Sequence, residues 1–565
     1  MHAKVPHAPR TAAERLPAPG PARSFPASFL AALLPALVML ALGLWGLERG
    51  TVWRDEGATL QVARRSLPEI RHLLHHVDAV HGLYYALMHV LLPADPGAFA
   101  LRLPSVLAAS ATAALVAALG TRLARPRVGL WAGLLYAVTP LAGHYAQEGR
   151  SYALVAAGAA LATLLLVRAA DRPGRPAAWC AYATAAACTV LLHELAVLLL
   201  LAHAVTLLLS RVPRAVWRGW AAAAGAVCVL LLPLLLVSRG QSAQVSWLVP
   251  PDAAAADRLL RAFAGPTTRV LACGLALATV ALAPPWRARG RLALPAVALP
   301  LLVLPPAVLF TVSRHWPLYQ DRYVLFALAG LPLLVAAGAD RVARGAGALA
   351  RGACLPHSRF VRGPGFVSRL RFARPGVVSR LRFARPGSVR RRRFVCPRGA
   401  VAVLGAAVVG LALWWQLPLH RHDRAVGHGR EDPAAASAVA ARVVRPGEPV
   451  LFLPATARRV ALAHPDGFRR ARDLALGASP AASGTLYGEE VRPAELRRRL
   501  AAADRVWVLT EPPVLREARR RIARAGEAGR GLGTERLKLD VLEREFVPRA
   551  PYAVPGATLR LYVRR

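Results

Sequence analysis

Long runs of apolar residues, separated by short arginine-rich connectors, fill most of the chain before residue 417. A run of about 20 apolar residues matches the roughly 30 Å hydrocarbon core of a bilayer. A backbone in lipid must satisfy its own hydrogen bonds, so each run is expected to be a helix. The pattern predicts a polytopic α-helical membrane protein with about eleven transmembrane helices. The predicted spans are 29–47, 99–121, 128–143, 151–167, 177–193, 194–210, 219–237, 269–284, 292–312, 323–340 and 399–416.

The arginines between these runs predict the orientation of the chain, because positive charge favours the cytoplasmic side of a membrane. The loops near 48–98, 144–150, 238–268 and 313–322 carry mixed charge and are expected outside. An odd number of spans then places the tail, 417–565, outside as well. The basic segments, expected inside, are the N-terminal residues, the connectors with Arg122, Arg125 and Arg127, with Arg168, Arg172 and Arg175, with Arg211, Arg214 and Arg218, and with Arg287, Arg289 and Arg291, and the stretch 341–398.

A net charge of +42 ordinarily suggests a nucleic-acid partner. Here most of the charge lies in loops between predicted spans, so we expect contacts with membrane lipids and no nucleic acid. The six cysteines show no CxxC spacing, so the sequence indicates neither a zinc site nor a disulfide framework.

The spans divide the chain into five segments. These are a cytoplasmic N-terminal segment at 1–28, a transmembrane domain at 29–340, an arginine-rich cytoplasmic loop at 341–398, the last transmembrane helix at 399–416, and an extracytoplasmic domain at 417–565. The basic loop contains a tandem repeat, residues 367–376 and 378–387, and its high charge predicts disorder. A contact with anionic lipid or nucleic acid is the alternative.

The tail has the pattern of a small α/β domain. Residues 449–453 and 505–509 are short apolar runs typical of buried strands. Residues 495–503 and 514–525 are predicted helices, and 558–563 alternates like an edge strand.

Ionisable and aromatic residues gather in the loops that this topology places outside. Carboxylates near a membrane surface can activate a hydroxyl or hold a divalent cation, and arginine can hold a phosphate bidentately. The alternative is that each cluster caps its own helix or anchors the membrane interface. Four clusters on one side favour a site for a phosphate-linked donor and a hydroxyl acceptor. The clusters are Asp55-Glu56 with Asp78 and His81, residues 144–152, His193-Glu194, and residues 315–323.

The order of these motifs resembles the GT-C membrane glycosyltransferases, in the branch of protein-O-mannosyltransferases and aminoarabinose transferases (glycosyltransferase family 39 type). The resemblance covers roughly residues 25–340. The family often has prolines after the histidine, where this chain has Gly82 and Leu83, and it does not predict the insertion at 341–398. The matching motifs are Asp55-Glu56, Asp78-x-x-His81-x-x-Tyr84-Tyr85, Gln147-Glu148-x-Arg150-x-Tyr152 and Tyr319-x-x-Arg322-Tyr323.

The resemblance implies inverting transfer of a sugar, with mannose as one candidate, from a polyprenyl-phosphate donor. The acceptor would be a hydroxyl of a protein, lipid or glycan on the extracytoplasmic face. By the same resemblance Asp55 is the catalytic base, Glu56 holds the acceptor or a cation, and Glu148 is the second acidic site residue. Arg150 and Arg322 would meet the donor phosphate. Further substrate-binding candidates are Asp78, His81, Tyr84, Tyr152 and Tyr319, and a divalent cation, with Glu56 and His81 as candidate ligands, is a candidate cofactor.

Two other functions fit part of the pattern. A transporter or flippase for a lipid-linked glycan would place charges or broken helices at the bilayer midplane. The predicted spans instead keep their ionisable groups at their ends. A non-catalytic membrane scaffold whose tail binds a partner would not need Asp55-Glu56 together with Arg322. The expected location is the cell membrane, with the site and the tail outside.

Overall fold

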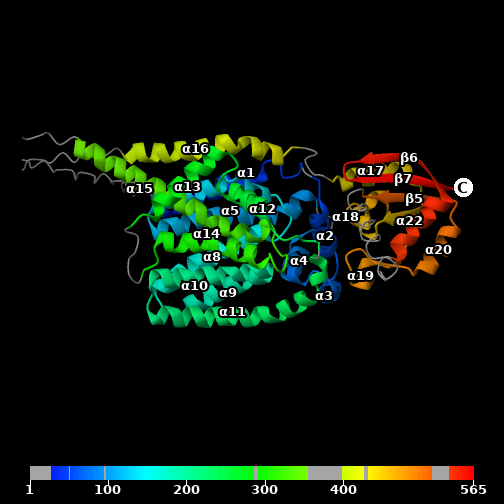
Figure 1. Ribbon diagram of the computed structural model, residues 1–565, viewed down its shortest axis with the longest axis horizontal. Helices are drawn as coiled ribbons and strands as arrows, with labels where there is room; N and C mark the ends of the chain where they lie inside the picture. Colours follow the sequence, from blue (N-terminus) through cyan, green and yellow to red (C-terminus); the bar gives the residue numbers. More distant parts are fainter. Residues whose placement is uncertain are drawn as a thin grey trace, which may run out of the picture.

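The computed structural model describes residues 27–49, 51–93, 97–245, 247–284, 291–353, 398–425, 431–511 and 533–565. A helical bundle and a smaller domain with a β-sheet lie end to end along the longest axis of the molecule (Figure 1). The tandem repeat at 367–387 and the predicted helix at 514–525 fall outside the described residues.

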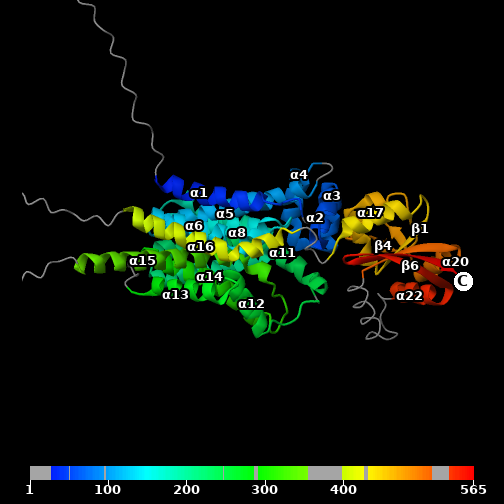
Figure 2. The ribbon, with the colours of Figure 1, turned by 90° about the horizontal axis from the view of Figure 1, so that it is seen from above.

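The long helices of the bundle run side by side along this axis (Figures 1 and 2). Each predicted span overlaps a helix of the bundle. The helices are α1 (Ala27–Leu44), α5 (Ala98–Leu123), α6 (Pro126–Ala137), α7 (Pro140–Ala146), α8 (Tyr152–Asp171), α9 (Pro176–Leu192), α10 (Leu198–Ser210), α11 (Arg214–Gly240), α12 (Ala253–Ala264), α13 (Thr268–Leu282), α14 (Leu294–Val312), α15 (Gly330–Ala353) and α16 (Arg398–Asp423).

Fewer helices than predicted could cross a bilayer by length and composition. Among the described residues six helices meet this test, or seven if α12 and α13, bent by 75°, form one broken span. Helices α9 and α10 are apolar but shorter. The multi-pass α-helical architecture is confirmed, while the number eleven stays a prediction. Helix α15 extends to Ala353, so the first part of the predicted basic loop is helical.

Two surfaces of the bundle show why these sequences form membrane helices. Helix α11 leaves large apolar side chains exposed, such as Val229 (72%) and Leu236 (65%), which suits contact with lipid chains. Helices α5 and α6 instead pack closely through small residues. A Cβ on Gly129 would lie 2.2 Å from the carbonyl oxygen of Ala117, so only glycine fits there.

His203 is an ionisable residue inside the bundle, contrary to the expectation that the spans keep such groups at their ends. His203 of α10 is 1% exposed. Its ring nitrogens contact Thr163 Oγ1 of α8 at 3.0 Å and Tyr182 OH of α9 at 2.9 Å. Both ring nitrogens thus have hydrogen-bond partners, and His203 links α8, α9 and α10.

Short helices close the end of the bundle that faces the smaller domain (Figure 1). These elements are α2 (Arg54–Ala63), α3 (Leu67–His76), η1 (Ala79–His81), α4 (Gly82–Leu91), η2 (Glu194–Val197), η3 (Ser242–Val245) and η4 (Asp321–Ala329). All of the predicted outer-loop clusters fall on or beside this end.

The smaller domain is an α/β sheet domain. Its five-stranded sheet has the order β2-β1-β5-β7-β6, parallel from β2 to β5 and antiparallel beyond. The predicted strands at 449–453 and 505–509 are confirmed as β1 and β5. The prediction of an edge strand at 558–563 is wrong, because β7 pairs with strands on both sides. The elements are α17 (Pro433–Val443), β1 (Pro449–Leu453), η5 (Ala455–Arg458), α18 (Arg459–Ala463), η6 (Pro465–Gly467), β2 (Arg472–Asp473), β3 (Leu476–Ala478), α19 (Pro480–Ser483), β4 (Glu489–Glu490), α20 (Pro493–Ala501), β5 (Arg505–Thr510), α22 (Gly533–Glu545), β6 (Phe546–Val554) and β7 (Ala557–Arg564).

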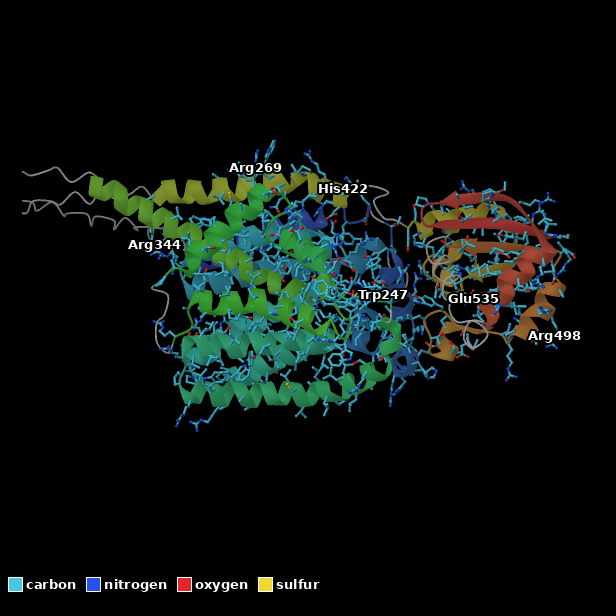
Figure 3. All side chains as sticks on the ribbon, viewed as in Figure 1. Trp247, Arg269, Arg344, His422, Arg498 and Glu535 are labelled. Atoms are coloured by element: carbon cyan, nitrogen blue, oxygen red, sulfur yellow. The ribbon has the colours of Figure 1, made fainter. Side chains whose placement is uncertain are left out.

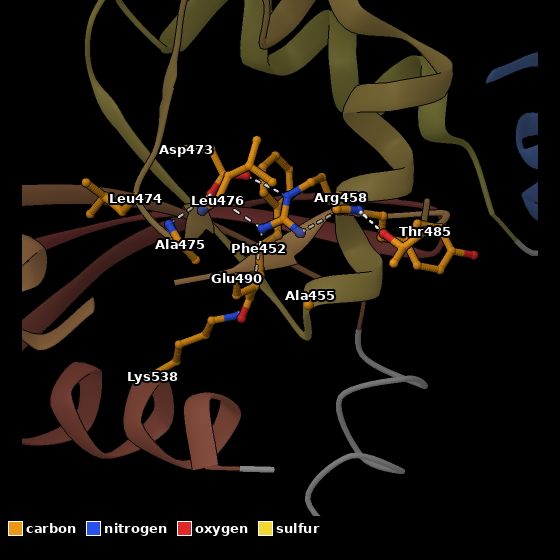
Figure 4. Close-up of polar contacts among 12 residues, drawn as sticks. Phe452, Ala455, Arg458, Asp473, Leu474, Ala475, Leu476, Thr485, Glu490 and Lys538 are labelled. Atoms are coloured by element: carbon orange, nitrogen blue, oxygen red, sulfur yellow. Dashed lines mark hydrogen bonds and ion pairs between the residues drawn. The ribbon is translucent and has the colours of Figure 1, made fainter. Parts of the chain in front are cut away.

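A buried ionic network ties these elements together (Figure 4). Arg458 bonds Asp473 at 2.6 Å and Glu490 at 3.0 Å. Lys538, fully buried, reaches the same Glu490 at 2.7 Å and donates to the Phe452 carbonyl at 3.1 Å. Because each buried charge has an opposite partner, the network links β1, β2, β4 and α22 without an orphaned charge.

The smaller domain rests directly on α2 and α3. Arg54 pairs with Glu431 at 3.3 Å, and Thr51 Oγ1 donates to the Glu431 carbonyl at 3.2 Å. Arg65 donates to the Thr485 carbonyl at 2.9 Å. The helix that carries Asp55 and Glu56 therefore lies between the bundle and the sheet domain.

Candidate active site

Helix α2 presents the two adjacent acids to different surroundings. Successive residues of an α-helix point about 100° apart, so Asp55 and Glu56 cannot share one environment. Glu56 Oε2 accepts a hydrogen bond from the backbone N–H of Trp53 at 3.3 Å, which helps to begin the helix. Asp55 points to the other side, toward η4.

Glu56 is fully buried and engaged by protein groups. Arg102 of α5 holds both its oxygens, at 2.8 and 2.7 Å, and the backbone N–H of Gly149 donates to Oε1 at 2.8 Å. Arg102 also donates to the carbonyls of Leu47 and Thr51, both at 2.9 Å. Both carboxylate oxygens of Glu56 therefore have protein partners that tie α2 to α5, and the expected role of Glu56 in holding an acceptor or a cation stays a prediction.

Asp55 forms an ion pair with Arg322, the residue expected to meet the donor phosphate. The distance from Arg322 Nη1 to Asp55 Oδ2 is 3.3 Å, and the two side chains are 17% and 23% exposed. Two groups that are 267 positions apart in sequence are therefore adjacent and accessible. A carboxylate and a guanidinium in this arrangement can take up a hydroxyl proton and a phosphate side by side.

Arg150 lies buried at the centre of the site. It donates to the Asp55 carbonyl at 3.2 Å and to Thr59 Oγ1 at 3.4 Å. Its Nη2 lies 2.8 Å from His81 Nε2. Burial, and then the charge of Arg150, hold the pKa of His81 well below its ordinary value. A neutral imidazole accepts this hydrogen bond, so Arg150 connects α2 to η1 while remaining charged.

Asp78 and Tyr85 fix the loop that carries His81. Asp78 has a left-handed backbone, with φ of 58°, and its carboxylate accepts a hydrogen bond from Tyr85 OH at 2.7 Å. Gln244 accepts from the Asp78 N–H at 3.2 Å. Burial raises the pKa of Asp78. Tyr84 is fully buried, and its hydroxyl has no hydrogen-bond partner among the described groups.

Aromatic rings surround Arg322. Its guanidinium carbon lies 5.6 Å from the ring centre of Tyr152 and 5.7 Å from that of Tyr323. The ring of Tyr323 also contacts that of His193, with the ring centres 4.7 Å apart and the planes tilted by 50°. Tyr319, another predicted substrate-binding residue, instead packs on Phe310 of α14 at 5.6 Å.

An open cavity of about 730 Å³ adjoins these residues. Asp78, His81, His193 and Tyr323 give it a polar side. Apolar residues line the rest, among them Leu195, Leu235, Leu248, Trp316 and Leu318. Asp55 and Arg322 do not line this cavity. They are connected to its lining residues, Asp55 to His81 through Arg150 and Arg322 directly to Tyr323.

Several residues of the site were missed by sequence reasoning. Arg102 stands in a predicted span, and a charge inside an apolar run is a signal that could have identified it. Gln241 and Gln244 at the end of α11 hold the Asp78 loop, with Gln241 Oε1 accepting from the Ala79 N–H at 3.0 Å. Nothing in their local sequence distinguishes them from ordinary polar residues at the end of a helix.

The predicted cation ligands do not come together. Glu56 is engaged by Arg102, and His81 by Arg150. Among the described residues no group of three or more His, Cys, Asp or Glu side chains could hold a metal ion. The residues present therefore do not form a cation site around Glu56 and His81.

Glu148 is expected to make the stability of the protein depend on pH. It is buried, its Oε1 has no hydrogen-bond partner among the described groups, and burial raises its pKa to about 7 from 4.5. Because the carboxyl pKa is higher in the folded state than in the unfolded state, the folded protein keeps its full stability below the unfolded-state pKa of 4.5. This contribution to stability is lost as the pH rises through the folded-state pKa of about 7. Glu148→Gln should match the wild type near pH 4 and be more stable at pH 8, by up to about 3 kcal/mol.

Thermal unfolding of both proteins in detergent at the two pH values measures this difference. Glu69→Gln, at an exposed helix cap, is the control and should not become more stable than the wild type at pH 8. A constant difference between Glu148→Gln and the wild type at both pH values would show that Glu148 does not titrate in this range.

Comparisons with known proteins agree with this architecture. Residues 80–237 match the family model described as dolichyl-phosphate-mannose-protein mannosyltransferase. The structure of ArnT from Cupriavidus metallidurans in the apo state is similar over 95% of this chain and 98% of that one, with 14% identity and a TM-score of 0.55. ArnT from the same organism bound to undecaprenyl phosphate is similar over 94% and 97%, with 14% identity and a TM-score of 0.53. A comparison with curated protein sequences finds no match.

The family match covers motifs of the candidate site from His81 to His193, and the structural likeness covers nearly the whole chain, including the sheet domain. The resemblance inferred from the order of the motifs is thus confirmed. Residues 80–237 are similar to the dolichyl-phosphate-mannose-protein mannosyltransferase family, and the fold of the chain is similar to that of ArnT.

Proposed function

We propose that the protein transfers a sugar from a polyprenyl-phosphate donor to an acceptor hydroxyl on the extracytoplasmic face, with inversion at the anomeric carbon. The observation that carries the proposal is the accessible ion pair of Asp55 and Arg322 beside a large cavity that is polar on one side and apolar on the other. Mannose is the sugar suggested by the description of the matching family, and the ArnT structure bound to undecaprenyl phosphate supports a polyprenyl donor.

The chemistry needs one base and one group that stabilises the leaving phosphate. Asp55 takes the proton of the acceptor hydroxyl as its oxygen attacks the anomeric carbon. The bond from that carbon to the phosphate oxygen breaks, and polyprenyl phosphate leaves with the electron pair. Arg322 pairs with the leaving phosphate, which also releases Asp55 from its resting ion pair.

Arg150 and the apolar part of the cavity complete the assignment. Arg150 adds a fixed positive charge and holds the α2 backbone at Asp55 in place. Leu235 and Leu248 give the polyprenyl chain an apolar wall, while His81 and Tyr323 face the head of the donor. Glu56 acts indirectly, by positioning α2 through Arg102.

Incubating the purified protein with defined polyprenyl-phosphate sugars, polyprenyl-phosphate mannose first, tests the proposal. Release of polyprenyl phosphate that requires both the acceptor and Asp55 is the expected result. Acceptors should include a peptide, a lipid and a cell-envelope glycan, because the acceptor class is open. Donor binding without release for every combination would contradict a transferase and favour a carrier of the lipid-linked sugar.

The orientation proposed for the protein places 341–398 inside and the C-terminal domain outside, because the basic connectors favour the cytoplasm. Reporter fusions at Arg380 and after Arg565 should therefore report opposite sides of the membrane. A fusion after Arg211, in another basic connector, is the control and should agree with the fusion at Arg380. Agreement between Arg380 and Arg565 would instead show that an even number of spans separates them.

A further inference from the structure

A second cavity lies at the end of the bundle opposite the candidate active site. It has a volume of about 410 Å³ and lies where α5 and α13 end and α6 and α14 begin, beside the middle of α15. Arg344 marks this end in Figure 3. The described residues that line it include five arginines and one acid, Asp340; the arginines are Arg122, Arg125, Arg291, Arg341 and Arg344.

The buried carboxylate of Asp340 holds several arginines at this cavity in place. Its side chain is 3% exposed and pairs with Arg125 at 3.6 Å, Arg127 at 2.5 Å and Arg344 at 3.0 Å. Arg125 and Arg344 nevertheless keep 40% and 51% of their side chains exposed. One buried carboxylate therefore fixes several guanidinium groups without neutralising them, and they remain accessible to a further anion.

The other arginines add charge that is only partly balanced. Arg122 pairs with Asp171 at the end of α8, and Arg341 donates to the Val280 and Ala283 carbonyls at the end of α13. Arg291 has no ion-pair partner among the described residues. Because arginine binds phosphate oxygens bidentately, such a set suits a ligand with a phosphate group.

The walls of the cavity indicate where that phosphate comes from. Between the arginines lie apolar residues, among them Leu123, Val128, Leu292 and Leu294. A free phosphate would make no apolar contact with this surface, whereas the glycerol and first methylenes of a lipid would pack against it. We propose that this cavity binds the phosphate headgroup of an anionic membrane lipid, with arginines around the phosphate and the apolar wall against the lipid stem.

Binding of short-chain phosphatidylglycerol to the purified full-length protein in nonionic detergent tests the site. Phosphatidylcholine and inorganic phosphate are titrated in parallel. Phosphatidylglycerol should bind more tightly than either, and Arg125→Gln/Arg291→Gln should weaken its binding about tenfold or more, the scale of one lost charge-assisted contact. The charge-matched control is Arg214→Gln/Arg218→Gln, at exposed positions where α11 begins, and it should bind like the wild type.

The single variant Arg291→Gln keeps the test valid if the double variant does not fold, because Arg291 makes no ion pair with the described residues. It should weaken phosphatidylglycerol binding severalfold, whereas unchanged binding would overturn the proposal. Equal weakening by the α11 control would show unspecific attraction and also overturn it. If phosphatidylcholine binds as tightly as phosphatidylglycerol, the site does not recognise an anionic headgroup and the proposal is wrong. Inorganic phosphate with equal affinity would assign the cavity to a free anion.

Discussion

Asp55→Asn is expected to lower the rate of sugar transfer at least about a hundredfold, the usual scale for the loss of a general base. Asparagine keeps the size of the side chain but cannot take a proton from the acceptor. Expression and thermal stability should change little, because Asp55 is partly exposed and its side chain has one described ion pair, with Arg322. Single-turnover transfer with saturating donor and acceptor measures the chemical step.

Arg322→Ala is the informative comparison, because it removes the other half of the same pair. We expect weaker donor binding and a raised KM for the polyprenyl-phosphate sugar, owing to the lost phosphate contact. Asp55→Asn should leave donor binding intact. Near-normal transfer by a well-folded Asp55→Asn protein would show that Asp55 is not the base, and Glu148 would be the next carboxylate to test.

Glu56→Ala is expected to destabilise the folded protein by roughly 3–5 kcal/mol, because it leaves the guanidinium of Arg102 buried without its partner. The loss should also lower transfer, since α2 would no longer be held against α5 and the Gly149 N–H would lose its acceptor. Thermal unfolding in detergent measures the change in stability.

An exposed pair provides the control for this effect. Asp257 and Arg261 form an i,i+4 ion pair with side chains 55% and 40% exposed, so Asp257→Ala should cost less than about 1 kcal/mol. The two roles considered for Glu56 give different results. If Glu56→Ala has normal stability but greatly reduced transfer, Glu56 contacts a substrate directly. If stability and transfer are both lost, Glu56 acts by positioning α2.

The adjacent acids show how far a motif can be interpreted without a structure. Asp55-Glu56 is visible in the sequence as a pair, and the family resemblance assigns both residues to the chemistry. The turn of the helix separates them, and the surrounding helices decide what each can do. Arg102 comes from a predicted span and neutralises Glu56, so only Asp55 stays accessible beside Arg322.

The sequence by itself determined the membrane class, the positions of the helices, two strands of the sheet domain and most of the residues near the site. Apolar runs, charged connectors and short motifs are local properties, and each constrains its own segment. It misplaced β7 at an edge, because alternation along one strand does not reveal how many neighbours that strand has.

Only the tertiary structure decided which of those residues meet. Arg322 reaches Asp55, Arg150 reaches His81, and Gln244 reaches the Asp78 loop because helices distant in sequence end at the same level of the bundle. Packing also decides which charges are neutralised, as with Glu56 by Arg102, and which stay accessible, as around Asp340. Pairing depends on distance and burial, and neither is encoded by the spacing of residues along one segment.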